Sequence, residues 1–208
     1  MLSIGLIAGA AAPAAADLHY NAGPRKVVVN QAYEEVRWSV GGSDSLSVED
    51  ADATLEHAAT RDWADWDYAT AAPFSGTLRI DGYSPMGRYQ VYGDVYDYDY
   101  NEMAATPAYV TVKRASHAKL SATRSQGRLN LTAVTRRYTG SYPSWGAHRG
   151  ATIRFQRKIG ANWRTFASRK VASNGVNTLR FRASARTYRV VVVETAAVWG
   201  STSGMLRR

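Results

Sequence analysis

The chain has 208 residues, with 26 Lys and Arg against 17 Asp and Glu, and it contains no cysteine. A hydrophobic content of 45% and a charged content of 21% are ordinary for a folded globular protein and argue against wholesale disorder. The lack of cysteine excludes a disulfide framework, and the length fits one large or two ordinary domains.

The first sixteen residues, MLSIGLIAGAAAPAAA, have the apolar stretch and small-residue cleavage region of a secretory signal peptide. The apolar run from Leu2 to Ala12 is too short for a membrane span, and Pro13 and Asp17 follow it closely. No Lys or Arg precedes the run, which departs from the usual pattern, and a buried N-terminal helix is the alternative. We predict a signal peptide over residues 1–16 and a secreted, extracellular or cell-surface protein. The excess of Arg over Lys, 21 to 5, indicates a GC-rich bacterial source.

Charge divides the remaining chain into two opposite halves near Lys113. Residues 17–113 hold seven Lys and Arg against sixteen Asp and Glu, a balance of −9, and residues 114–208 hold nineteen against one, a balance of +18. Such asymmetry bears on partners and association rather than on fold. We predict an acidic domain over 17–113 and a basic domain over 114–208. Their charges should attract, either within a chain or head-to-tail between chains.

Short runs of alternating apolar and polar residues, separated by turn-forming residues, follow one another along both halves. The predicted strands of the first half are 25–29, 35–40, 53–58, 65–70, 77–81, 88–95 and 109–114. Those of the second half are 119–124, 129–138, 152–158, 163–170, 178–182, 188–194 and 202–206. Two sets of seven short strands predict an all-β chain of two tandem antiparallel β-sandwiches.

One short motif occurs in both halves at a comparable place. Gly87-Arg88-Tyr89-Gln90-Val91 matches Arg186-Thr187-Tyr188-Arg189-Val190, and each lies about one strand before its domain ends. Immunoglobulin-like (Ig-like) sandwiches place a corner tyrosine at the start of their penultimate strand, where its hydroxyl bonds to the preceding loop. The motif predicts this role for Tyr89 and Tyr188; the alternative is that Tyr-x-Val suits any strand. The absence of a Cys…Trp…Cys framework excludes antibody-type domains.

Residues 151–204 contain RFQRKIGANWRTFASRKVASNGVNTLRFRA, then YRVVVVE and WGSTSG. This stretch resembles the bacterial Ig-like repeats of secreted actinobacterial proteins, and the first half resembles them loosely. The resemblance implies an Ig-like fold and an extracellular setting. It implies little about activity, because such sandwiches host many roles.

Enzyme signatures are missing from the chain: it has no Cys nucleophile and no HExxH, GxSxG, GxGxxG or Walker motif. The four histidines are isolated and none has metal-pair spacing. We predict no enzymatic activity and no obligatory cofactor. A small extracellular hydrolase whose site is assembled by folding remains an alternative.

The densest acidic cluster runs from Asp94 to Glu102. Its oxygen-bearing side chains are of the type that Ca²⁺ prefers, so Asp94, Asp97, Asp99 and Glu102 form a candidate calcium site. The run lacks the glycine and the terminal Glu spacing of an EF-hand loop. The alternative is a solvated acidic loop whose tyrosines cover the edge of the core.

A second cluster places Trp63 and Trp66 around Asp65. Aromatic rings beside a carboxylate suit sugars, since the ring stacks on the sugar CH groups and the carboxylate accepts hydroxyl hydrogens. These three residues form a candidate glycan site. The two tryptophans are three residues apart, so on a regular strand they face opposite ways and one belongs to the core.

The basic half carries nine cations on predicted neighbouring strands, and several of them would share one sheet face. Such a face would bind polyanions, with an affinity that falls steeply with salt. The alternative is charge that only solubilises. The nine residues are Arg154, Arg157, Lys158, Arg164, Arg169, Lys170, Arg180, Arg182 and Arg189.

The pattern as a whole favours a non-enzymatic binding module built from Ig-like domains. Its expected partner is an extracellular protein or a cell-wall polymer, with head-to-tail self-association as a further expectation. The main alternative is an electrostatic binder of extracellular polyanions (wall polymer, acidic glycan or nucleic acid) through the basic domain.

Overall fold

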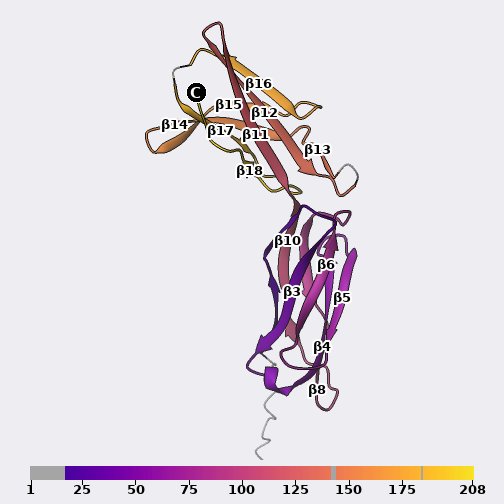
Figure 1. Cartoon of the computed structure of the whole chain (residues 1–208). Coiled ribbons are helices and arrows are strands. Elements are labelled where there is room, and N and C mark those ends of the chain that lie inside the picture. The colour runs from indigo at the N-terminus through magenta and orange to yellow at the C-terminus, as the bar shows by residue number, and fades with distance from the viewer. Residues whose placement is uncertain (1–16, 142–143, 184) are drawn as a thin grey trace, which may run out of the picture.

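The computed structural model describes residues 17–141, 144–183 and 185–208. The predicted signal peptide, residues 1–16, lies outside the described residues. In the described part of the chain, the one helical element is a single turn, η1 (Ser45–Ser47), and the rest is strand, turn and loop. No helix in that part is long and apolar enough to cross a membrane. Two β-sandwiches follow one another end to end and form an elongated, bent molecule (Figure 1).

The first sandwich consists of two sheets. One has the strand order β6-β3-β1-β9, and the other has the order β2-β10-β7-β4-β5, with β8 paired to β4. The chain leaves the first sheet after β1 and joins the second as β2, which runs parallel to β10. The strands are β1 (Leu18–Gly23), β2 (Lys26–Val29), β3 (Tyr33–Gly42), β4 (Val48–His57), β5 (Trp63–Ala69), β6 (Ser75–Asp81), β7 (Gly87–Tyr92), β8 (Val95–Asp97), β9 (Ala105–Thr106) and β10 (Ala108–Arg114).

The second sandwich repeats this order with fewer strands. One sheet contains β11, β12 and β16, with β13 paired to the end of β12, and the other has the order β15-β14-β17-β18, with β19 also paired to β17. Its strands are β11 (Ser116–Ser125), β12 (Arg128–Tyr138), β13 (Trp145–Ala147), β14 (Thr152–Ile159), β15 (Asn162–Lys170), β16 (Val176–Phe181), β17 (Thr187–Val192), β18 (Ser201–Thr202) and β19 (Leu206–Arg207). In each sandwich, the first, second and fifth long strands form one sheet and the remaining long strands form the other. This is the Ig-like arrangement.

Alternation along the strands builds two separate cores. In β3, for example, Val36, Trp38 and Val40 are buried, whereas Glu35 and Arg37 are exposed. Tyr89 in β7 is fully buried and its hydroxyl donates to the Pro85 carbonyl at 2.8 Å, which is the predicted corner hydrogen bond. Tyr188 has the matching place in β17 and is 1% exposed. The predicted all-β class with two antiparallel Ig-like sandwiches is confirmed.

The observed strands differ from the predicted ones in a few places. The prediction missed β1, β9 and β13. The predicted strand 88–95 is interrupted, because Gly93 lies against Asp52 and the chain re-pairs there as β8. The predicted strand 202–206 is two short strands, β18 and β19, which pair with different parts of β17.

Candidate binding surfaces and the domain junction

The chain passes from one core to the other through Ala115. The Ala115 amide donates to the Val29 carbonyl at 2.8 Å, and its own carbonyl accepts from the Tyr138 amide at 3.0 Å. The segment before Trp199 returns to this point, because Arg114 exchanges backbone hydrogen bonds with Ala197 and Trp199, both at 3.0 Å. The junction is therefore bonded to both sandwiches.

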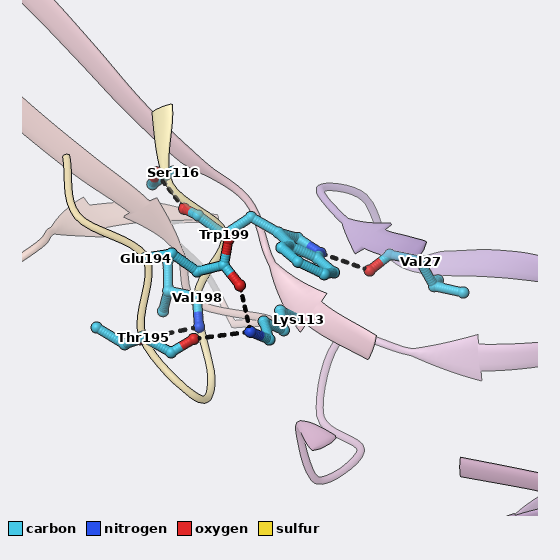
Figure 2. A network of polar contacts seen from close by, with 7 residues as sticks. All are labelled: Val27, Lys113, Ser116, Glu194, Thr195, Val198 and Trp199. Carbon is cyan, nitrogen blue, oxygen red and sulfur yellow. Dashed lines mark hydrogen bonds and ion pairs between the residues drawn. The ribbon is translucent and has the colours of Figure 1, made fainter. Parts of the chain in front are cut away.

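Trp199 and an ion pair close one side of the junction (Figure 2). The Trp199 indole Nε1 donates to the Val27 carbonyl of edge strand β2 at 2.9 Å. Two ammonium groups contact its ring, with Lys26 Nζ 4.0 Å and Lys113 Nζ 4.5 Å from the ring centroid. Lys113 Nζ also donates to Glu194 Oε1 at 2.6 Å and to the Thr195 carbonyl at 3.0 Å. The Lys113 side chain is 13% exposed and the Glu194 side chain is 46% exposed, so solvent reaches this pair from the Glu194 side.

Tyr138 closes the opposite side. Although it ends β12 of the second sandwich, it is 4% exposed and belongs to the core of the first, where Trp145 contacts its ring edge-on. Gly82 and Gly140 approach each other beside it, and a Cβ on Gly140 would lie 2.1 Å from the Gly82 carbonyl oxygen. Hydrogen bonds and packed side chains of both sandwiches therefore meet at the junction.

The ion pair at the junction has the opposite polarity to the charge split: its cation belongs to the acidic half and its carboxylate to the basic half. Glu194, the one carboxylate of residues 114–208, pairs with Lys113 of the acidic half. Within the described residues there is one other ion pair, Arg61 with Glu56, which lies inside the acidic half. No acidic side chain of the first sandwich therefore pairs with a basic side chain of the second in the described part of the chain.

Exposed aromatic side chains gather on the outer side of β4, β5 and β8, together with carboxylates. Trp66 and Tyr68 are 52% and 47% exposed, and their rings stack at 6.1 Å with an interplanar angle of 12°. The Tyr68 hydroxyl donates to Asp50 Oδ2 at 3.1 Å, and Tyr96 pairs with Asp50 across β4 and β8. We call Asp50, Asp52, Trp66, Tyr68 and Tyr96 the aromatic face.

The pKa values of this face are displaced by its acidity and partial burial. Burial raises the pKa of the Asp52 carboxyl, while hydrogen bonds from the Asp94 backbone and the Trp66 indole oppose that rise. Burial and the bond to Asp50 raise the pKa of the Tyr68 phenol. The Asp94 carboxylate is the main cause of a raised pKa at Tyr96. The two phenols therefore stay protonated and can donate hydrogen bonds.

The predicted glycan residues are only partly brought together. Trp63 and Trp66 are both exposed, at 65% and 52%, so the expectation that one belongs to the core is wrong. The reason is a β-bulge in β5, which inserts Ala64 and breaks the strict alternation. Asp65 is used elsewhere, since its Oδ2 accepts the Arg79 amide of edge strand β6 at 2.7 Å. Asp50 and Asp52 are the carboxylates beside Trp66 and Tyr68.

The predicted calcium residues lie in and around the turn after β8. The Asp97 carboxylate accepts hydrogen bonds from the amides of Asp99 and Asn101, both at 2.9 Å, and from the Asn101 side chain. These bonds lower the pKa of Asp97. The Asp94 amide bonds to Asp52, and Glu102 forms a bridge to Tyr96. Across the described ranges, no three His, Asp or Glu side chains converge into a group that could hold a metal ion.

The nine predicted polyanion-binding residues divide among three places. Four lie on the outer face of the β15-β14-β17 sheet, where Arg189 also lies over the Trp163 ring at 4.2 Å; they are Arg154, Lys158, Lys170 and Arg189. Three lie on the opposite side of that sheet, at its exposed margin; they are Arg157, Arg164 and Arg169. Arg180 lies on the other sheet with Arg182 just beyond it, and Arg180 donates to Gln126 at 3.2 Å.

Sequence reasoning missed the junction residues. Trp199 and Tyr138 have no linear signal. The Trp199 indole bonds to Val27, which is 172 positions away in the chain, and Tyr138 belongs to the core of the first sandwich although it ends β12 of the second. The resemblance of residues 151–204 includes Trp199, but it indicated only a strand. The hydrogen bonds from the edge of β6 to the Asp65 and Asp67 side chains were not predicted either, although Asp65 itself was a predicted glycan residue.

Comparison with known proteins identifies no family. No family model and no curated protein matches the chain. Among solved structures, the chain is similar to a marsupial T cell receptor at 9% identity, with 92% of this chain and 70% of that chain covered and a TM-score of 0.33. A similarity this low supports no assignment of fold or role. The Ig-like assignment therefore rests on the strand order and on the corner tyrosine.

Proposed function

We propose that this chain is a non-enzymatic interaction module, secreted or held at a cell surface, that presents separate binding surfaces from two locked Ig-like domains. The distribution of large exposed hydrophobic side chains carries the proposal. In the described residues, the second sandwich exposes Ile159 and Met205, whereas the first exposes nine such side chains. These nine are Tyr33, Leu46, Trp63, Trp66, Tyr68, Tyr83, Tyr98, Tyr100 and Tyr109.

The aromatic face is the principal binding surface in this proposal. Trp and Tyr are enriched at binding hot spots, because a rigid ring buries a large area and its N–H or O–H group still forms a hydrogen bond. Asp50 and Asp52 lie among the rings and favour a partner that brings cations or hydroxyl groups. The partner is an extracellular protein or a cell-wall polymer.

Capture by the mature chain, residues 17–208, tests this function. The wild type and the W66A/Y68A variant are immobilised and exposed to the producer's wall fragments and secreted proteins. We expect a specific partner that the wild type and L46A retain and that W66A/Y68A loses. Leu46 is the matched control, because it is 89% exposed on the same sandwich but lies outside the aromatic face. An identical set of captured molecules for all three proteins would contradict the proposal.

Polyanion binding by the basic domain is a second candidate. It is favoured by Arg157 and Arg164, which are directly opposed across β14 and β15. Like charges in that position destabilise a sheet unless a counter-ion binds between or near them. We expect R157Q/R164Q to reduce the affinity for heparin and for single-stranded DNA, and to flatten its salt dependence, more than R180Q/R182Q does. Equal effects of the two pairs would indicate net charge alone.

A further inference from the structure

A groove of about 740 Å³ lies at the edge of the first sandwich, where β1 passes beside β10. Its wall combines residues of both sheets with the segment that joins β1 to β2. The lining residues are His19, Tyr20, Asn21, Ala22, Gly23, Arg25, Arg37, Trp38, Ser39, Arg88, Pro107, Ala108 and Tyr109.

Cations are concentrated in this groove. Arg25, Arg37 and Arg88 are three of the seven Lys and Arg of the acidic half, and His19 lies with them. None of the thirteen lining residues is Asp or Glu, although residues 17–113 contain sixteen. An adjoining hollow of about 800 Å³ shares Gly23 and Arg37 and contains Glu34 and Glu35. Arg25, Arg88 and His19 therefore line the β1–β10 groove alone, whereas Arg37 lies between the groove and this hollow.

None of the three guanidinium groups forms an ion pair with a carboxylate in the described residues. All three arginines are exposed, and no Asp or Glu in the described residues lies within ion-pair distance of any of them. Arg88 lies over the Tyr109 ring, with its Cζ atom 3.7 Å from the ring centroid, and an arginine stacked in this way can still donate hydrogen bonds from its N–H groups. Like charges in one hollow repel one another, and an oxyanion bound between them would remove that repulsion.

We propose that the β1–β10 groove is a binding site for a small molecule that carries carboxylate, phosphate or sulfate groups. Arg25, Arg37 and Arg88 supply planar N–H forks that match the oxygen pairs of these anions, and His19, Asn21 and Ser39 supply further polar contacts. The volume is that of an ordinary small-molecule site. Recognition must be local, because the domain as a whole carries −9 and repels anions at a distance. The site is independent of the aromatic face and of the basic domain.

Titration calorimetry at constant ionic strength tests the site on residues 17–208, with citrate, pyrophosphate and glucose 6-sulfate as probes. We expect saturable binding of at least one probe, weakened at least tenfold in R37Q and in R88Q. The probe that binds best distinguishes a carboxylate from a phosphate or a sulfate ligand. R37K should recover only part of the affinity, because an ammonium group lacks the planar fork.

Two matched controls separate the groove from net charge. R79Q removes one exposed cation from the same sandwich outside the groove, and K158Q removes one from the basic domain. Both should change the affinity less than twofold, and melting curves check that each variant is folded. No saturable binding of any probe, or an equal loss in R79Q and R37Q, would overturn the proposal.

Discussion

The two sandwiches share a strand order and a buried tyrosine in β7 and β17, but their surfaces have opposite character. The first is acidic, and its β4–β5–β8 side carries exposed Trp and Tyr. The second has one carboxylate, and its aromatic residues Phe166, Phe181 and Tyr188 contact one another in and beside the core. The same inward pattern is thus compatible with very different outward residues.

This difference separates the determinants of fold from those of binding. The inward residues of both sandwiches must fill a core about 10 Å thick, which restricts them to apolar and aromatic types. The outward residues have no such restriction, so they can differ between the domains according to what each domain binds. Variants in each sandwich, and changes of salt and pH, can test how far fold and surface are independent.

The corner tyrosines should be equally important in both sandwiches. Because both rings are fully buried, Tyr89→Ala and Tyr188→Ala should each lower the free energy of unfolding by about 3–5 kcal/mol. Tyr89→Phe, which removes only the bond to Pro85, should cost about 1 kcal/mol. Denaturant titration measures these losses, with the half-exposed Tyr33→Ala as control. A loss under about 0.5 kcal/mol at Tyr188 would show that it is no corner residue.

Trp199→Ala should uncouple the two sandwiches. It removes the hydrogen bond to Val27 and the contacts with Lys26 and Lys113, together worth about 1–3 kcal/mol. We expect calorimetry to resolve two unfolding transitions, and X-ray scattering to show a wider range of interdomain angles. Trp163→Ala, which removes an aromatic ring on the outer sheet face, should do neither. Unchanged scattering in Trp199→Ala would mean that Tyr138 and the Ala115 connection suffice.

The unpaired charges should act between chains rather than within one. Exposed pairs contribute only about 1 kcal/mol each at 4 Å in water, and salt screens them over about 8–10 Å. We therefore expect the mass measured by light scattering to rise at low salt and to return to the monomer value above about 0.5 M salt. The dimensions of the monomer should not change, because the junction does not use the charge split. A constant mass would leave the split as a solubility feature.

The basic sandwich should also respond to mild acid through His148. This side chain is 4% exposed, and burial, with a smaller contribution from Arg137, lowers its pKa below 6.5. The unfolded chain then binds more protons than the folded one between the folded pKa and 6.5. Stability should consequently be full above about pH 6.5 and fall as the pH drops through that window. Thermal melts from pH 7.5 to 5 measure this, and His148→Leu should flatten the slope. An equal slope in that variant would assign the effect to other groups.

Regular alternation explains which features the sequence predicts well. Leu129, Leu131 and Ala133 alternate without interruption, and β12 lies within one residue of its predicted bounds. The strand that begins near Trp63 was predicted less well, because the bulge at Ala64 reverses which residues face outward. Strands β9 and β13 have two and three residues, too few to show a period. Their pairing partners decide that they are strands.

The candidate surfaces show the same division. The charge split, the acidic tyrosine-rich run and the cluster of cations are linear features, so composition and local pattern alone determine them. Composition and local pattern do not predict which of these residues lie together in space. Nine predicted cations divide among three places, and Arg25, Arg37 and Arg88 meet in one groove although 63 positions separate the first from the last.

The all-β class, the two-sandwich architecture and the buried tyrosines of β7 and β17 can be predicted from the sequence, because they depend on a two-residue period and on local turn chemistry. Three other features depend on folding: the contacts between the two sandwiches, the combination of Trp66 and Tyr68 with Asp50 and Asp52, and the cationic groove. Each of these requires side chains from strands that pair or pack only after the chain has folded. No local sequence pattern predicts these contacts, because they depend on the register in which strands pair and on how the two sheets pack.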